Sequence, residues 1–127
     1  MKDRSVEVSA TELAILEVLW EQSQATIREI DRRLYRRPTT ATYATVQKLL
    51  DRLERKGCVA RDRSGFAHVF RATVERKTLI DQRLQEVADK LCGGSFTPLI
   101  THLVEARRLS SRDRQALRKW IDSQAEP

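Results

Sequence analysis

The hydrophobic pattern of this chain changes its period at Gly57, and that change limits the possible folds more than any other feature of the sequence. Before Gly57, apolar residues recur at every third or fourth position, which is the spacing of amphipathic helices. After it come two short runs, residues 58–63 and 66–71, separated by Ser64 and Gly65. Because a Ser-Gly pair between two such runs is typical of a turn, this segment predicts a β-hairpin.

The part before the hairpin predicts three helices. Residues 9–12 and 26–29 each have the pattern of a capping box, so a helix begins at each. The first runs to about Gln22, and the second ends before Pro38, which disfavours helical geometry in the preceding residue. A third follows the threonine-rich segment 39–42 and ends at the glycine where the period changes. The apolar stripes expected to face a shared core are Leu13, Leu16, Leu19 and Trp20, then Ile27, Ile30 and Leu34, then Val46, Leu49, Leu50 and Leu53.

This order of elements predicts two domains. Three helices and a hairpin predict a winged helix-turn-helix domain over residues 1–73, so the fold class is mainly α with a small β-hairpin. Residues 74–127 predict three further helices with narrow apolar stripes, too short a segment to build a large core of its own. We expect a second copy of the chain to cover these stripes in a helical dimerisation domain, with folding back onto the N-terminal domain as the alternative. The residues expected in the dimer contact are Ile80, Leu84, Val87, Leu91, Leu99, Leu103, Leu117 and Trp120.

The charge of the chain is basic and concentrated in one segment. Twenty-four Lys and Arg against eighteen Asp and Glu give a formal net charge of +6. Residues 28–63 alone hold eleven basic and five acidic residues, whereas residues 1–27 are net acidic. A basic surface favours a polyanionic partner, either nucleic acid or an anionic membrane surface. We expect the 28–63 segment to face that partner.

No segment of the sequence predicts a membrane-spanning or secretory element. The longest stretch without Asp, Glu, Lys or Arg is residues 91–104, well short of the roughly twenty residues that a spanning helix needs. Asp3, Glu7 and Glu12 interrupt the position that the apolar core of a signal peptide would occupy. We therefore expect a cytoplasmic protein with no membrane partner.

The third helix carries the candidate functional face. With its apolar stripe turned inward, the opposite face presents Ala44, Thr45, Lys48 and Arg52, with Thr42 at the N-terminal tip. Small side chains let a helix approach the floor of a DNA major groove, and the basic ones reach bases or phosphates. A solvated face without a partner is the alternative, although Glu and Lys would be commoner there. The hairpin adds a basic wing that is suited to the flanking DNA backbone or minor groove: Arg61, Arg63, His68 and Arg71.

The sequence holds no constellation for catalysis, a metal or a cofactor. It has two His and two Cys, no glycine-rich phosphate loop and no Gly-x-Ser-x-Gly motif. Cys58 and Cys92 lack the paired spacing of a zinc site. We expect both to be reduced, mostly buried thiols. A redox or metal-sensing role is the alternative, and Cys92 is the better candidate for it. We therefore expect no enzyme activity, no cofactor and no bound metal.

Four segments together resemble one known family. Residues 42–57 (TYATVQKLLDRLERKG) resemble the recognition-helix signature of the penicillinase-repressor transcriptional regulators, of the BlaI, MecI and CopY type. Residues 15–20 (ILEVLW) are similar to the first helix of that family, residues 63–70 to its wing and residues 91–95 to its C-terminal motif. The similarity spans nearly the whole chain in the order of the family.

The resemblance implies a homodimeric repressor that binds palindromic operator DNA through its third helix and dimerises through its C-terminal helices. The DNA contacts that it implies are Thr42, Thr45, Lys48, Arg52, Arg63 and His68. The chain has no Asn, and so lacks the Asn-Phe bond cleaved in antibiotic-responsive members, and it lacks the C-terminal Cys cluster of copper-responsive members. The inducing signal and any regulatory protease therefore stay unassigned. A winged-helix module that binds an acidic protein is the alternative function.

Overall fold

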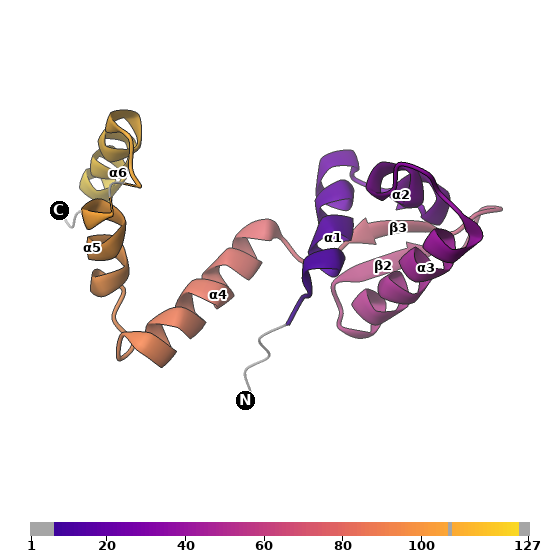
Figure 1. Cartoon of the computed structure of the whole chain (residues 1–127), viewed down its shortest axis with the longest axis horizontal. Coiled ribbons are helices and arrows are strands. Elements are labelled where there is room, and N and C mark those ends of the chain that lie inside the picture. Colours follow the sequence, from indigo (N-terminus) through magenta and orange to yellow (C-terminus); the bar gives the residue numbers. More distant parts are fainter. Residues whose placement is uncertain (1–6, 107, 125–127) are drawn as a thin grey trace. The chain divides into compact units, whose positions relative to one another are not determined.

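The computed structural model describes residues 7–106 and 108–124 of a chain that divides into two compact units, residues 1–82 and 83–127. The first unit contains α1 (Ala10–Gln22), β1 (Ala25–Thr26), α2 (Ile27–Leu34), α3 (Thr40–Arg55), β2 (Val59–Asp62) and β3 (Val69–Ala72), as Figure 1 shows. Helix α4 (Arg76–Leu91) begins in the first unit and continues into the second, where α5 (Thr97–Glu105) and α6 (Ser111–Ser123) follow. The predicted winged-helix order of a mainly helical chain with a small antiparallel sheet is confirmed.

Capping boxes fix the starts of the helices where the sequence predicts them. At α1, the Ser9 hydroxyl accepts a hydrogen bond from the Glu12 amide at 3.1 Å, and the Glu12 carboxylate accepts one from the Ser9 amide at 2.9 Å. Thr26 and Glu29 form the same reciprocal pair at α2. At α3 a second threonine takes the place of the usual carboxylate. Each of these three helices therefore begins at a residue whose side chain satisfies an otherwise unpaired backbone donor.

The sheet differs from the predicted hairpin in two ways. It has three antiparallel strands in the order β1-β3-β2, and β1, which pairs Ala25 with Phe70, is too short to show an alternating pattern in the sequence. The prediction that Phe66 and His68 lie in a strand is wrong, because the ladder ends at the pair Asp62 and Val69 and leaves residues 63–68 as a loop. A carboxylate oxygen of Asp62 accepts a hydrogen bond from the Ser64 amide at 2.9 Å, which turns the chain away from the ladder.

The core of the first unit lies between the helices and the sheet. Its fully buried side chains include Phe70 from β3 and the free thiol of Cys58. Leu79 of α4 also joins this core. Leu13, predicted to face inward, is instead 38% exposed, since at 3.6 residues per turn it lies about 120° from Leu19, which is central to the buried arc of α1. The remaining core is formed by Ile15, Leu16, Val18, Leu19, Ala25, Ile27, Ile30, Val46, Leu49, Leu50, Leu53 and Val59.

The second unit leaves its apolar side chains at the surface. Ala88 is its one buried residue among those that the structure describes. Of the eight residues predicted for the dimer contact, Leu99 is half-buried and the other seven are exposed. Val104, Leu109, Leu117 and Ile121 line an open groove of about 370 Å³ between α5 and α6. Within the described ranges, no helix combines the length and apolar character needed to cross a membrane.

Glu12 is buried at the start of α1 and joins that helix to the end of α3. Its carboxylate accepts a hydrogen bond from the Lys56 ammonium at 2.7 Å. Burial alone would raise the pKa of Glu12, but the hydrogen bonds from Lys56 and Ser9 outweigh it and hold the pKa below its ordinary value of 4.5. Because the folded-state pKa is the lower one, this stabilisation is present above the unfolded-state pKa and is lost as the pH falls through the folded-state pKa.

We expect Glu12→Gln to lower the free energy of unfolding at neutral pH by about 1–3 kcal/mol, because glutamine keeps the capping acceptor but leaves the Lys56 ammonium without its carboxylate. Denaturant unfolding at several pH values measures this, and the difference from the wild type should shrink as the pH falls through the lowered pKa of Glu12 and its carboxylate becomes protonated. Glu29→Gln is the matched control, because Glu29 caps α2 in the same way at an exposed position. Equal losses in the two variants would contradict the role given to the Glu12–Lys56 pair.

Candidate nucleic-acid interface

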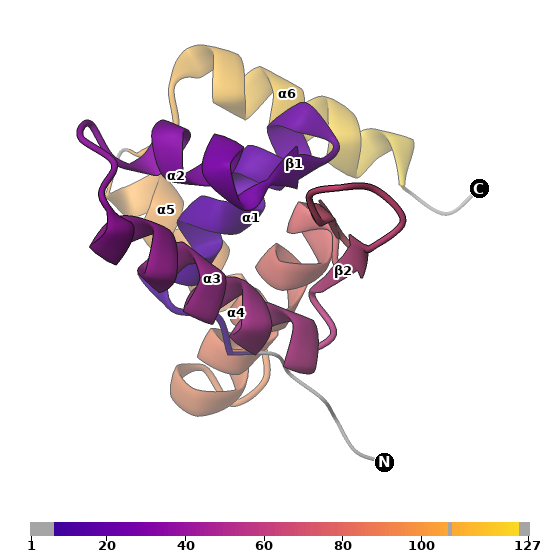
Figure 2. The same ribbon diagram turned by 90° about the vertical axis from the view of Figure 1, so that its right-hand side faces the viewer.

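Helix α3 has a buried apolar stripe on one side and a solvent-exposed face on the opposite side. Leu50 and Leu53 are completely buried, whereas Ala44, Lys48 and Arg52 on the opposite side are exposed, as is Thr45. The N-terminus of α3 and the loop between β2 and β3 lie at the same end of the first unit (Figure 1), the end that faces the viewer in Figure 2. A helix face and a basic loop at one end can occupy a DNA groove and its flank together.

Two threonine hydroxyls of this face are engaged by α3 itself. Thr42 Oγ1 accepts a hydrogen bond from the Thr39 amide at 2.7 Å and donates one to the Thr39 carbonyl at 3.0 Å. Thr45 Oγ1 donates to the Ala41 carbonyl at 3.0 Å. A hydroxyl has a single hydrogen to donate, so Thr45 can offer a base only its acceptor lone pairs and its methyl group. The half-buried Thr42 is left chiefly with its methyl group.

Helix α2 adds two basic residues beside the turn that leads to α3, which the sequence groups only within the basic segment 28–63. An open pocket of about 520 Å³ lies there, beside the N-terminus of α3. Exposed Arg28 and Arg32 line it, and unpaired backbone N–H groups at a helix N-terminus favour a negatively charged group. Only the geometry of the turn brings these arginines together with α3. The other lining residues are Asp31, Pro38, Thr39, Thr40 and Tyr43.

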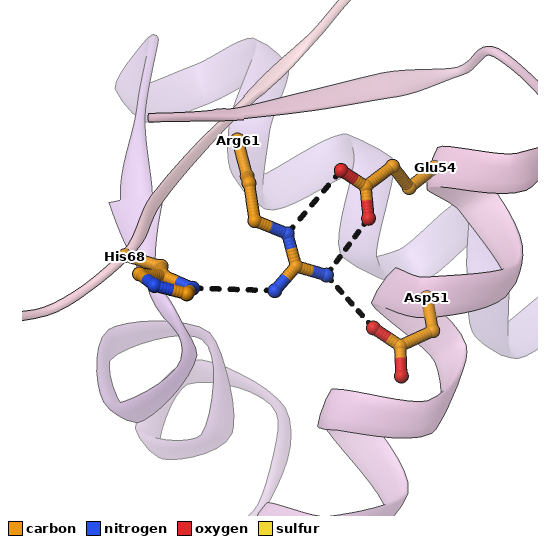
Figure 3. Close-up of polar contacts among 4 residues, drawn as sticks. All are labelled: Asp51, Glu54, Arg61 and His68. Carbon is orange, nitrogen blue, oxygen red and sulfur yellow. Dashed lines mark hydrogen bonds and ion pairs between the residues drawn. The ribbon is translucent and has the colours of Figure 1, made fainter. Parts of the chain in front are cut away.

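Arg61 of β2 fastens the wing to α3 instead of facing a partner. Its guanidinium donates two hydrogen bonds to Glu54, at 2.8 and 3.3 Å, and one to Asp51 at 2.8 Å (Figure 3). It also lies over the Phe70 ring, 4.7 Å from the centroid. The side chain is only 12% exposed. The prediction that Arg61 belongs to the DNA-facing set of the wing is therefore wrong.

The electrostatics of Arg61 follow from this position. Burial alone would lower the pKa of its guanidinium, but the hydrogen bonds and charges of Glu54 and Asp51 raise it overall. The two carboxylates lie on the helix that carries the candidate face, and the single positive charge of Arg61 offsets one of their two negative charges. His68 Nδ1 lies 3.2 Å from the guanidinium Nη1, and because arginine can only donate, this ring nitrogen is the acceptor (Figure 3).

The loop of residues 63–68 holds the remaining wing residues. Arg63 is exposed in the loop, His68 is half-buried at its end and Arg71 is exposed on β3. Neither arginine forms an ion pair with another residue in the described ranges. The hydrogen bonds from Ser64 hold the pKa of the exposed Asp62 below its ordinary value. Arg63 and Arg71 thus have guanidinium groups available to a polyanion.

The structure offers little for metal or thiol chemistry. In the described part of the chain, no group of three or more His, Cys, Asp and Glu is placed to hold a metal ion. Burial raises the pKa of the Cys58 thiol, and Cys92 is a half-buried free thiol. A buried thiol with a raised pKa forms little thiolate, the reactive form, so Cys58 is suited to packing.

A family model that covers most of the chain identifies the family to which it belongs. The model of the penicillinase repressor family matches residues 8–123. A penicillinase repressor of Bacillus licheniformis is 22% identical over 84% of this chain and 83% of its own length. The methicillin resistance regulatory protein MecI of Staphylococcus aureus is 21% identical over 96% of this chain and 98% of its own length. The solution structure of the DNA binding domain of the repressor BlaI covers 61% of this chain and 93% of its own, with 26% identity and a TM-score of 0.50.

Proposed function

Because the chain belongs to the penicillinase repressor family, we propose that it is a homodimeric repressor of transcription that binds palindromic operator DNA and is released by a signal still to be identified. One observation carries the proposal: α3 exposes a face of small and basic side chains, and Arg61 fixes a basic wing against that same helix. Two relatives are named as repressors, and one is described as a DNA binding domain. These names and the basic charge support DNA as the polyanionic partner.

In this proposal α3 lies in the major groove. Ala44 and Thr45 let the helix backbone approach the bases, and their methyl groups suit thymine methyls. Lys48 and Arg52, one and two turns further along the helix, reach guanine edges or phosphates. Arg63 and His68 lie on the wing, where Arg63 is free to bind the flanking phosphates and His68 already accepts a hydrogen bond from Arg61.

The second unit supplies the dimer in this proposal. Its exposed apolar side chains are more than a small helical unit leaves open without a partner, and a second copy of the chain covers them by two-fold symmetry. Two identical DNA-binding units then face two identical half-sites, which makes the operator a palindrome. We place the DNA-binding domain in residues 1–73 and the dimerisation domain in residues 74–127, with Leu79 anchoring the first turns of α4 to the N-terminal core.

We expect Lys48→Ala and Arg52→Ala each to weaken operator binding, by about 1–3 kcal/mol where the side chain contacts a base edge. A phosphate contact would instead reduce the salt dependence of binding by about one charge. Selection of bound genomic fragments with the purified protein identifies the operator, and mobility-shift titrations at several salt concentrations measure both effects.

Lys119→Ala is the matched control, because Lys119 is also an exposed cation but lies on α6 of the second unit. It should leave operator affinity close to that of the wild type. Unchanged affinity and salt dependence in both α3 variants would contradict the assignment of this face. Binding to random DNA no better than to heparin, together with capture of one acidic protein, would instead support the protein-interaction alternative.

A further inference from the structure

Phe66 is the most exposed large apolar side chain in the described part of the chain. Its relative exposure is 109%, so the whole ring stands in solvent, whereas Phe70 is fully buried and Phe96 is 39% exposed. Phe66 belongs to the loop between β2 and β3. That loop projects from the end of the sheet (Figure 1). A single exposed apolar residue is ordinary on a protein surface. This ring differs because it stands on the basic loop beside the candidate DNA-binding helix, where a partner could cover it.

The loop presents Phe66 from a fixed base. At one end the Asp62 carboxylate accepts a hydrogen bond from the Ser64 amide at 2.9 Å, and at the other the His68 ring accepts one from Arg61 at 3.2 Å. Arg61 is itself held by two carboxylates of α3, so the base of the loop is tied to the recognition helix. The neighbours of Phe66 are Gly65 and Ala67, which leave the ring free to enter a narrow space.

The charge around the ring selects the partner. The loop of residues 63–68 contains no acidic residue, and exposed guanidinium groups of Arg63 and Arg71 lie on the loop and the adjoining strand. An apolar ring beside two cations matches the DNA minor groove, which combines apolar sugar walls with rows of phosphates. Proteins that bind there use phenylalanine among their apolar wedges.

On the basis of the proposed function, we propose that Phe66 is an apolar minor-groove anchor. When α3 lies in the major groove, the loop reaches the adjacent minor groove, where the Phe66 ring packs against the deoxyribose walls and Arg63 binds the phosphates. The ring then adds affinity without adding charge, and it reads the width of the groove and not a hydrogen-bond pattern.

The test compares Phe66→Ala, Phe66→Leu and Arg63→Ala in the full-length protein on the selected operator. We expect Phe66→Ala to lower operator affinity roughly tenfold with an unchanged salt dependence, whereas Phe66→Leu keeps most of the affinity. Arg63→Ala should reduce the salt dependence by about one charge.

Hydroxyl-radical footprinting should show protection of the flanking minor groove in the wild type that is lost in Phe66→Ala. Thermal unfolding should be the same for the wild type and Phe66→Ala, because the ring packs against nothing in its own chain.

Operator affinity and minor-groove protection of Phe66→Ala equal to those of the wild type would overturn the proposal. A change in the mass of the dimer with unchanged DNA affinity would also overturn it, since the ring would then contact a second copy of the chain. These outcomes differ from failure of the proposed function itself, in which the wild-type protein would show no preference for selected over random DNA.

Discussion

Replacing Leu84 and Leu103 together by glutamate is expected to lower affinity for the full palindrome by about 10²–10⁴-fold. These side chains are 47% and 41% exposed on α4 and α5, where the proposed dimer would bury them. Two carboxylates in a desolvated apolar contact prevent association. The two DNA-binding units then bind independently, and the second loses the high effective concentration that the dimer provides.

Light scattering measures the mass of this variant, and mobility-shift titrations on the palindrome and on a single half-site measure its affinity. The half-site affinity should stay close to that of the wild type, because the first unit has its own buried core. Thr101→Glu with Gln115→Glu is the matched control, since it adds the same charges at exposed polar positions of α5 and α6. A Leu84 and Leu103 variant that remains dimeric and binds the palindrome with wild-type affinity would contradict the proposed dimer surface.

Local signals explain why so much of the first unit could be predicted. Capping boxes, Gly57 and Pro38 act through neighbouring backbone atoms, so they predict the helix boundaries without knowledge of the fold. Gly57 indeed ends α3 with a φ of +79°, a left-handed conformation that suits glycine. The period of the apolar residues likewise identifies the exposed face of α3, because the inward stripe and the outward face are fixed relative to each other.

What the sequence could not supply depends on partners that are distant along the chain. Strand β1 exists only because Ala25 and Thr26 pair with β3, more than forty residues away. Arg61 has the same local pattern as Arg63, yet its contacts with Asp51 and Glu54 turn it inward and leave Arg63 outside. One signal in the sequence could have distinguished Arg61 from Arg63. Two carboxylates one turn apart on a DNA-binding helix would repel the phosphates, so a cation of the protein is expected beside them.

Replacing Arg61 is expected to reduce both the stability of the first unit and its DNA binding. The side chain contacts Glu54, Asp51, His68 and the Phe70 ring, so Arg61→Met removes the three polar contacts and the cation that lies over the ring. The side chain of Asp51 is 49% exposed and that of Glu54 is 33% exposed. Water therefore compensates in part for the lost guanidinium. We expect a loss of about 1–3 kcal/mol in the free energy of unfolding.

DNA binding should fall further than the stability loss explains. Without Arg61, Asp51 and Glu54 present uncompensated negative charge beside the phosphates, and the base of the wing is released from α3. We expect operator affinity to drop at least about tenfold under conditions in which the variant is still fully folded. Arg61→Lys should recover only part of this affinity, since a single ammonium lacks the planar fork that binds both carboxylates together.

Neutralising the two carboxylates separates the electrostatic effect from the loss of wing position. Combining Arg61→Met with Asp51→Asn and Glu54→Gln removes the uncompensated charge, so thermal stability and affinity for random DNA should return toward those of the wild type. Preference for the operator should stay low, because the wing is still not tied to the recognition helix. Arg63→Ala is the control that removes one exposed cation of the same wing, and it should leave stability unchanged. Full recovery of operator preference in the triple variant would show that Arg61 acts only through its charge. Wild-type operator affinity in the Arg61→Met variant alone would show that Arg61 has no role in DNA binding.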